Sequence, residues 1–372
     1  DEAVATPAEV TAIITQLCEQ QRAELKKIPS LQTLADTIEW KIIPVLATME
    51  QAGILLDTQY LKLMSAQVDD MISDLEQQIY GFADEEFNIS SPAQLATILF
   101  EKLKLETAGI KKGKTGYSTA ASELDKLRGT HPIIDMITQY REVTKLKNTY
   151  IDTLPKQVDK NSRVHTTYNM ATAPTGRLSS VDPNLQNIPV RTELGKRIRT
   201  AFVAEKGNVF VSADYSQFEL RLAAVLADDK EMINNFNRGI DVHTMTAAQV
   251  YGRDPEEVTK NMRREAKVVN FGIMYGLSTH GLVAATGMSY DQAKKFIEKY
   301  FETRPKLKEY LATIKEKAKE DGYVETLLGR RRPTPDVKSS NFMVREGAIR
   351  AAINMPFQGS AADIMKIAMI NI

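Results

Sequence analysis

Hydrophobic residues recur at intervals of three and four positions after Asp57. The repeat consists of Leu61, Met64, Val68, Met71, Leu75 and Ile79. This spacing places them on one face of a helix and predicts a long helix that begins at Asp57. A second helix is predicted to start at Ser91, because Pro92 stands in its first turn and Gln94 follows three residues after the cap.

Residues 1–38 are helix-prone and contain no recognisable chemistry. Asp36 and Glu39 lie three positions apart, with no cluster of other candidate metal ligands around them. We therefore interpret this pair as a solvated helix face.

Short apolar runs predict strands in the first part of the chain. The predicted segments are Leu46–Glu50 and Ile54–Leu56 on either side of Gly53, Val164–Ala171, and a hairpin of Ala201–Ala204 and Val209–Ala213 around the turn 205–207. Beyond residue 216, the pattern is almost entirely helical. Strands that precede helices without regular alternation favour an α+β fold over a doubly wound sheet.

The composition is that of ordinary globular protein. The chain has 372 residues, of which 43% are hydrophobic and 26% charged, enough for two or three folded units. Lys+Arg and Asp+Glu both number 48, so the formal net charge is zero. A globally basic nucleic-acid binder is excluded, and any polyanion site must be a local patch.

The cysteine count and the hydropathy pattern bear on the compartment of the protein and on whether it crosses a membrane. Cys18 is the single cysteine, so no internal disulfide can form, and the four histidines lie far apart in the sequence. These features favour a reducing, cytoplasmic compartment and do not predict a zinc site. No apolar run approaches the ~20 residues of a membrane helix, so no membrane partner is expected.

A basic segment lies between the predicted helices of the first part. Residues 101–114 contain five lysines and two glutamates, and the run GIKKGKT begins in this segment and ends at Thr115. Three residues separate the glycines where a phosphate-binding P-loop needs four, and no buried strand precedes them. We interpret the segment as a mobile basic loop that is able to contact a DNA backbone.

Asp214 follows the apolar run Val209–Ala213. A carboxylate at the exit of a buried strand is well placed to hold a divalent cation, with the Tyr215 carbonyl as a second hard oxygen ligand. Ser216 and Glu219 have the spacing of a capping box, and the simplest interpretation of Glu219 alone is that it caps the next helix.

Two cations and two aromatic residues follow one another at intervals of four. They are Arg263, Lys267, Phe271 and Tyr275. On a helix they form one stripe about 120° wide and ~18 Å long. Such a stripe suits a ligand with an anionic end and a planar end, for example a nucleoside triphosphate. The alternative is a solvated face whose cations extend their stems along it.

A long polar loop precedes these elements. It runs from Thr175 to Pro189 and continues into a basic stretch of Arg191, Lys196, Arg197 and Arg199. Loops of this length within a compact domain are often functional. The alternative is a surface connection with a solvated basic end.

Together these motifs resemble the family A DNA polymerases, the bacterial DNA polymerase I type. The similar segments are TKLKNTYID (144–152), TGRLSS and DPNLQNIPVR (175–191), DYSQFELR (214–221), RREAKVVNFGIMYG (263–276) and NMPFQGSAADIMKIAM (354–369). The likeness runs with gaps from about Ile54 to the last residue, in the order of the family.

The resemblance implies an α+β right-hand architecture, with an antiparallel palm sheet and mostly helical thumb and fingers. The implied ranges are a helical segment that precedes the polymerase domain (1–38), a lead into the palm (39–57), the thumb (58–138), the palm (139–227), the fingers (228–357) and a further, incomplete part of the palm (358–372).

The resemblance also implies roles for the candidate residues in nucleotide binding. Asp214 and the Tyr215 carbonyl would bind catalytic metal. Arg263 and Lys267 would grip the triphosphate, with His243 nearby. Phe271 would meet sugar and base, and Tyr275 would lie at the templating position. Glu219 would bond Tyr275 and exclude a 2′-hydroxyl, and Gln217 would join the nucleotide site.

The implied activity is DNA-directed DNA synthesis from dNTPs on a primer–template, with two Mg²⁺ ions, by a monomer. The implied DNA contacts are Arg177, Gln186, Asn187, Lys145, Arg350, Asn354 and Gln358. Minor-groove acceptors are nearly the same for every correct pair, so Arg and amide donors there sense pair geometry without reading sequence. The clusters 191–199 and 330–332 would supply local positive charge.

Two departures from the family pattern matter. The family places a second metal-binding aspartate after the helix that contains Ala361–Ile370, which is beyond Ile372. The region before residue 50 is too short for the family's 3′–5′ exonuclease, so proofreading is not predicted for this chain.

Two other functions stay open from the sequence. A single-subunit RNA polymerase is the first, and Glu219 and Phe271 argue against it. A DNA-binding remnant without catalysis is the second, and only the aspartate missing from the printed sequence supports it. Comparing ribonucleotide with deoxynucleotide incorporation tests the first, and the coding sequence after Ile372 tests the second.

Overall fold

Two separate hydrophobic cores organise the chain in the computed structural model, which describes residues 6–114 and 116–372. Unit 1 comprises Asp1–Thr48, Asn169–Ser179 and Ala213–Ile372, and unit 2 comprises Met49–Tyr168 and Ser180–Ser212. The α+β class is confirmed, because helices dominate and each sheet in the described residues is two-stranded.

Unit 2 is built on a long helix pair. Its helices are α4 (Thr58–Ala83), α5 (Pro92–Ala96), α6 (Ala121–Leu124), α7 (Pro132–Leu146) and α8 (Glu193–Thr200). Its strands are β1 (Ile54–Leu55), β2 (Lys112–Gly113), β3 (Gly116–Tyr117) and β4 (Arg163–Val164). The strands pair antiparallel as β1–β4 and β2–β3. Two further strands, β5 (Thr167–Asn169) and β6 (Ser179–Val181), form a sheet of their own.

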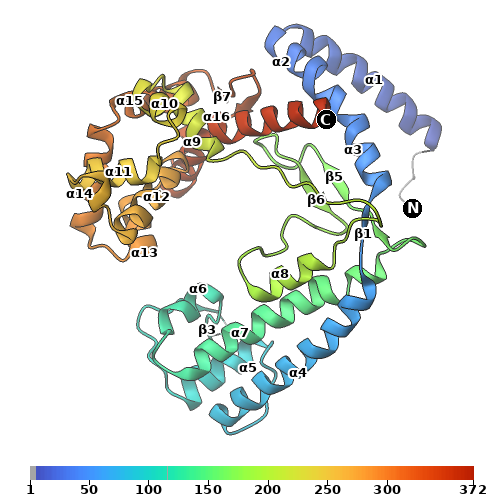
Figure 1. Ribbon diagram of the computed structural model, residues 1–372, viewed down its shortest axis with the longest axis vertical. Helices are drawn as coiled ribbons and strands as arrows, with labels where there is room; N and C mark the ends of the chain where they lie inside the picture. The colour runs from blue at the N-terminus through green and yellow to red at the C-terminus, as the bar shows by residue number, and fades with distance from the viewer. Residues whose placement is uncertain (1–5, 115) are drawn as a thin grey trace. The chain divides into compact units, whose positions relative to one another are not determined.

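The hydrophobic repeat after Asp57 forms α4 as predicted. Asp57 caps the helix, because its carboxylate accepts a 2.8 Å hydrogen bond from the Tyr60 amide. Five of the six repeat residues are buried, and Met71 is exposed. This face packs against α7, which contributes Ile133, Ile134 and Ile137 to the same core (Figure 1). Ser91 also caps α5 as predicted.

Unit 1 contains the remaining helices. They are α1 (Pro7–Lys26), α2 (Pro29–Leu34), α3 (Trp40–Ala52, which ends in unit 2), α9 (Phe218–Leu226), α10 (Lys230–Asn237), α11 (Val242–Tyr251), α12 (Lys260–Met274), α13 (Thr279–Thr286), α14 (Tyr290–Glu302), α15 (Pro305–Glu320) and α16 (Phe342–Asn371). Its hairpin pairs β7 (Tyr323–Glu325) with β8 (Arg331–Pro333). The helix α16 contacts α9, α12 and α15, and Figure 1 shows it passing beside α9.

Several predicted strands are wrong. Leu46–Glu50 lies in α3, and Val164–Ala171 contains only the end of β4 and the short β5. The expected hairpin keeps its turn, where the Asn208 amide donates to the Glu205 carbonyl at 2.9 Å, but Val209–Ala213 is not a strand. No strand of the described ranges pairs with that segment, and a lone extended segment has no ladder to satisfy its backbone.

The basic segment 101–114 is only partly a loop. Its last residues form β2, and the Lys111 amide donates a 3.0 Å hydrogen bond to Glu123. Thr115, the last residue of the GIKKGKT run, lies outside the described residues. Among the helices that the structure describes, none is long and apolar enough to cross a bilayer.

Candidate active site

Glu219 joins three segments that are far apart in the sequence. Its Oε1 accepts a hydrogen bond from Arg177 Nη2, and its Oε2 accepts one from the Tyr275 hydroxyl, both at 2.6 Å. The capping interpretation of Glu219 is wrong, because Gln217 is the N-cap of α9 and no side chain caps that helix. The ion pair with Arg177 and the hydrogen bond from the neutral Tyr275 hydroxyl together fix the position of the carboxylate.

Tyr275 ends α12 and stays protonated. Burial and the Glu219 carboxylate raise the pKa of the Tyr275 phenol to about 12, so it acts as a donor. Gly276 follows with a φ of +69°, and a Cβ there would lie 2.6 Å from Arg350 Cγ. The turn after α12 therefore packs closely on Arg350 of α16.

The cation–aromatic stripe lies on the open face of α12. Arg263, Lys267 and Tyr275 are exposed and Phe271 is half-buried. The opposite face is buried and includes Ala266, Val269, Asn270, Ile273 and Met274. The two faces differ because apolar positions on α12 repeat every three and four residues, and the stripe falls between them.

The first cation of the stripe is paired with the cap of α11. Arg263 Nε donates to Asp241 Oδ2 at 2.7 Å, and Asp241 also accepts from the His243 amide and from Thr244. Burial disfavours ionisation of Asp241, but these hydrogen bonds outweigh it and lower its pKa to about 2. Lys267 makes no ion pair within residues 6–114 and 116–372.

His243 lies beneath the stripe as a neutral ring. Burial lowers the pKa of His243 to about 4, so the imidazole is uncharged at neutral pH. Its ring centroid lies 5.6 Å from that of Phe271, and its Nδ1 lies 3.0 Å from Asn270 Nδ2.

The expected position of Asp214 at a strand exit is wrong. Val209 and Val211 are 81% and 87% exposed, and Asp214 and Tyr215 are also exposed. The Tyr215 ring stacks on Phe218 at a centroid distance of 4.5 Å. The local chain still places Asp214 only five residues before Glu219.

The oxygen atoms of the Asp214 carboxylate and the Tyr215 carbonyl are of the kind that binds magnesium, but they are too few to complete its coordination. A carboxylate and a main-chain carbonyl are hard oxygen donors, which Mg²⁺ prefers. However, no group of three or more His, Cys, Asp or Glu side chains in the described part of the chain is arranged to hold a metal. Asp214 and the Tyr215 carbonyl therefore do not by themselves make up a complete metal site.

Three of the predicted DNA contacts share one face of α16. Arg350, Asn354 and Gln358 are four residues apart, a spacing that places side chains on one side of a helix. Arg350 is exposed, whereas Asn354 and Gln358 are half-buried. Their unit also contains Arg177, which is exposed.

The other predicted DNA contacts belong to unit 2. Gln186 and Asn187 are exposed in the loop after β6, and Lys145 is exposed near the end of α7. Lys145 lines a cavity of about 700 Å³ together with Arg141 and Asn148.

A buried cluster of charges was not anticipated from the sequence. Glu39 accepts from Arg330 and, at 2.7 Å, from Lys366, while Arg330 Nε donates to Asp363 at 2.7 Å. Burial lowers the pKa of Lys366 and raises that of Asp363. Two expectations are wrong, because Glu39 does not lie on a solvated face and Arg330 does not belong to a free basic patch.

The cluster supports the loop that carries Arg177. Gly176 has a φ of +76°, and a Cβ there would lie 2.5 Å from Arg330 Nε. The guanidinium of Arg330 therefore packs directly beneath the residue that precedes Arg177. No sequence signal marks this arrangement, because Glu39 and Arg330 lie 291 residues apart.

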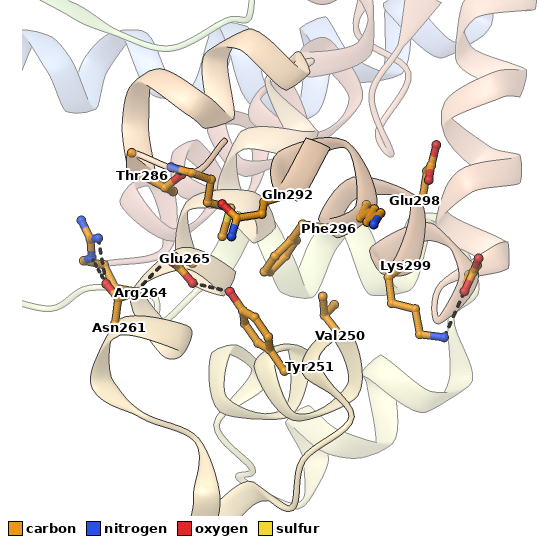
Figure 2. Close-up of a pocket in the computed structure, with 14 residues that line it drawn as sticks. Val250, Tyr251, Asn261, Arg264, Glu265, Thr286, Gln292, Phe296, Glu298 and Lys299 are labelled. Carbon is orange, nitrogen blue, oxygen red and sulfur yellow. Dashed lines mark hydrogen bonds and ion pairs between the residues drawn. The ribbon is translucent and has the colours of Figure 1, made fainter. Parts of the chain in front are cut away.

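A separate cavity of about 800 Å³ lies between α11, α12, α13 and α14, and Figure 2 shows the residues that line it. Tyr251 donates to Glu265 there, Asn261 donates to Glu265 at 2.8 Å, and burial raises the pKa of Tyr251. None of the candidate site residues lines this cavity.

Comparison with known proteins agrees with the fold. The POL domain of Pol1 from M. smegmatis, solved in complex with DNA primer-template and dNTP, superposes with a TM-score of 0.86 at 43% identity, over 94% of this chain and 61% of that chain. The fold is thus that of an α+β polymerase domain.

The sequence profile of DNA polymerase family A matches residues 58–372, and the chain belongs to this family. It is 48% identical over 359 residues to the thermostable DNA polymerase I of Thermus thermophilus, covering 96% of this chain and 43% of that protein. It is 47% identical over 363 residues to DNA polymerase I of Geobacillus stearothermophilus, covering 97% and 41%. The chain spans about two fifths of the length of these relatives.

Proposed function

We propose that the chain is the polymerase part of a DNA-directed DNA polymerase that adds deoxynucleoside triphosphates to a primer 3′ end. The observation that carries the proposal is the convergence of Arg177 and Tyr275 on Glu219, at the end of the cation–aromatic stripe. The M. smegmatis relative, described with primer-template and dNTP, supports the same ligands. In this proposal, residues 58–138 form the thumb, 139–227 and 358–372 the palm, and 228–357 the fingers.

The stripe of α12 would bind the incoming nucleotide. Lys267, exposed and without an ion pair in the described residues, would meet the phosphates first. Arg263 would join it by exchanging its Asp241 partner for a phosphate oxygen, since a guanidinium binds either anion in a bidentate fashion. His243, neutral and next to Phe271, would donate to a phosphate oxygen without adding charge.

The end of the stripe would select the sugar. The half-buried Phe271 ring offers an apolar surface to the sugar and base. Glu219 is held in place by two hydrogen bonds and would occupy the space next to C2′, so that a 2′-hydroxyl meets a fixed carboxylate. Tyr275 would lie at the templating position, and Gln217 would line the same site.

Polar donors would follow the minor groove of the primer–template. The proposed contacts of unit 1 are Arg177 and the α16 face of Arg350, Asn354 and Gln358; those of unit 2, taken by itself, are Gln186, Asn187 and Lys145. Amide and guanidinium donors suit the N3 and O2 acceptors that all correct pairs share. They would test the shape of the pair and leave sequence selection to the template.

Family membership implies dependence on a divalent metal. Asp214 and the Tyr215 carbonyl would hold Mg²⁺, and two such ions supply activation of the primer hydroxyl and stabilisation of the leaving pyrophosphate when bound. The residues of this chain then have the tasks of binding the triphosphate, aligning the sugar and holding the primer end.

Primer extension by the full-length protein with Mg²⁺ and dNTPs tests the proposal. We expect template-dependent incorporation, and Asp214→Ala should abolish it while DNA affinity stays within about twofold. Asp321→Ala, which removes an exposed carboxylate at the end of α15, is the matched control and should retain activity. DNA binding without incorporation by the wild type would instead show a non-catalytic binding protein.

A further inference from the structure

A buried chain of polar side chains runs from His243 to Arg304. It passes through Asn270 of α12 and Thr246 of α11. The exposed fractions are 2% for His243, 0% for Thr246 and Asn270, and 4% for Arg304. Groups this deeply buried are held mainly by hydrogen bonds to one another, although Arg304 Nε has no acceptor among the described residues.

Arg304 fixes one end of the chain. Its Nη2 donates to Thr246 Oγ1 at 2.7 Å, and its guanidinium lies over the Tyr300 ring at 4.6 Å. No carboxylate of the described residues lies within ion-pair distance of Arg304. Because a guanidinium has no acceptor atom, Thr246 Oγ1 must act as an acceptor on this side.

Thr246 has one hydroxyl hydrogen to give. Its Oγ1 lies 2.7 Å from the Val242 carbonyl and 3.2 Å from Asn270 Oδ1, and the shorter bond takes the hydrogen. Toward Asn270, the threonine oxygen is therefore an acceptor again. The group that faces it at 3.0 Å is Asn270 Nδ2, which donates.

The orientation of the Asn270 amide determines which nitrogen of the His243 ring carries the hydrogen. Its Nδ2 carries two hydrogens, one for Thr246 and one for His243 Nδ1 at 3.0 Å. In the orientation that the structure has, the donor atom Nδ2 is the amide atom nearer to the threonine oxygen, at 3.0 Å against 3.2 Å for Oδ1. With Nδ2 also facing the ring, His243 Nδ1 accepts, and a neutral ring then has its hydrogen on Nε2.

We propose that Arg304, Thr246 and Asn270 are positioning residues that fix His243 as the Nε2–H tautomer. The low pKa of the buried ring supports this assignment, since a neutral imidazole has two tautomers to choose between. The link to phosphate rests on the proposed function: Nε2–H donates to an anionic oxygen, whereas the other tautomer would point a lone pair at it. The tautomer itself does not depend on that function.

Nitrogen-15 NMR of the histidine rings at pH 7 tests the assignment directly in the full-length protein. His243→Gln identifies the signals of His243 by their loss. We expect an unprotonated Nδ1 and a protonated Nε2. A hydrogen on Nδ1 in the wild type overturns the proposal without need of any variant.

Two variants test the chain of hydrogen bonds from Arg304 to His243, which we call the relay. Asn270→Asp replaces the donor with a carboxylate that only accepts, so Nδ1 should become protonated, and an Nδ1 that stays unprotonated contradicts the relay. Thr246→Val removes the hydroxyl, and the single tautomer should give way to a mixture. Thr334→Val is the matched control, because the buried Thr334 hydroxyl also donates to a carbonyl at 2.7 Å; it should leave the His243 signals unchanged.

Kinetics separates this inference from the proposed function. If both hold, Asn270→Asp should raise KM for dNTP by about tenfold, the value of one hydrogen bond, with a smaller change in kcat. Arg304→Lys retains a cationic donor and should preserve the tautomer. The expected tautomer in a protein without polymerase activity would leave the relay standing and refute the proposed function.

Discussion

The Tyr275 hydroxyl donates a 2.6 Å hydrogen bond to Glu219, 56 residues earlier in the chain. The other oxygen of that carboxylate binds Arg177, so the end of α12, the start of α9 and the TGRLSS loop meet at one side chain. Two hydrogen bonds hold this carboxylate in one position. In the proposed function, substrate would meet an ordered carboxylate, whose conformational entropy is already lost.

The pKa of Tyr275 should fall when Glu219 loses its charge. Glu219→Gln removes the negative charge that helps to raise the pKa to about 12, while burial of the phenol remains. The pKa should therefore drop part of the way toward the ordinary 10.0. Carbon-13 NMR of labelled tyrosine, with Tyr275→Phe to identify the signal, measures it. An unchanged pKa would show that the hydrogen bond does not form in solution.

Removing the Glu219 side chain should weaken discrimination against ribonucleotides. Glu219→Ala opens the space that the fixed carboxylate fills, so the ratio of rNTP to dNTP kcat/KM should rise at least about tenfold. Single-nucleotide incorporation assays give both constants. Glu256→Ala, at an exposed acid of the same unit, should leave the ratio as it is. A ratio unaltered by Glu219→Ala would remove Glu219 from sugar selection.

Neighbouring arginines on α12 should differ sharply in importance. Arg263 lies on the stripe, whereas Arg264 is turned about 100° away and bonds Asn261. Arg263→Ala should lower kcat/KM for dNTP about 10²–10³-fold, as for loss of one preorganised charge-stabilising donor, and Arg264→Ala less than about threefold. Pre-steady-state incorporation measures both. Equal losses would mean that helix stability, rather than phosphate binding, is affected.

The buried charge cluster should be sensitive to the loss of a single member. Glu39→Gln leaves Lys366, whose side chain is 2% exposed, without its carboxylate, which should cost about 3–5 kcal/mol of unfolding free energy. Replacing both partners, with Glu39→Leu and Lys366→Met, should cost clearly less because no unpaired charge remains. Urea denaturation measures each variant, and Glu24→Gln, at an exposed pair with Lys27, is the control.

The same cluster predicts a contribution to acid stability. Burial raises the pKa of Glu39, but hydrogen bonds from Lys366 and Arg330 outweigh it and hold the pKa below the ordinary 4.5. Its stabilisation is therefore complete above pH 4.5 and is lost as the pH falls toward the lower value of the folded state. Glu39→Gln should flatten this part of the stability–pH curve. A curve of unchanged shape would mean that Glu39 contributes nothing there.

Local periodicity predicted the elements whose partners are close in sequence. The repeat after Asp57 gave α4 with its cap, and the spacing of Arg263 to Tyr275 gave the open face of α12, because both depend only on helix geometry. The wrong strand prediction at Val209–Ala213 shows the limit of this approach. An apolar run becomes a strand only when another strand pairs with it, and none of the described strands does.

Charged residues were the least predictable from sequence. Glu219 looked like a local cap, and Glu39 like a solvated residue, because each was judged against its neighbours on the same helix. Their real partners are 42 to 327 residues away. The family resemblance anticipated the bond of Glu219 to Tyr275, but nothing in the sequence indicated the Glu39 cluster.

The contact beneath Gly176 limits how this loop can vary. Any side chain there would need both a left-handed backbone and the displacement of Arg330 Nε, which lies 2.5 Å from the Cβ position. Gly176 is therefore fixed by the fold, whereas the side chain of Arg177 is exposed. The loop can thus vary in the side chain that it exposes, but not in the residue that packs on Arg330.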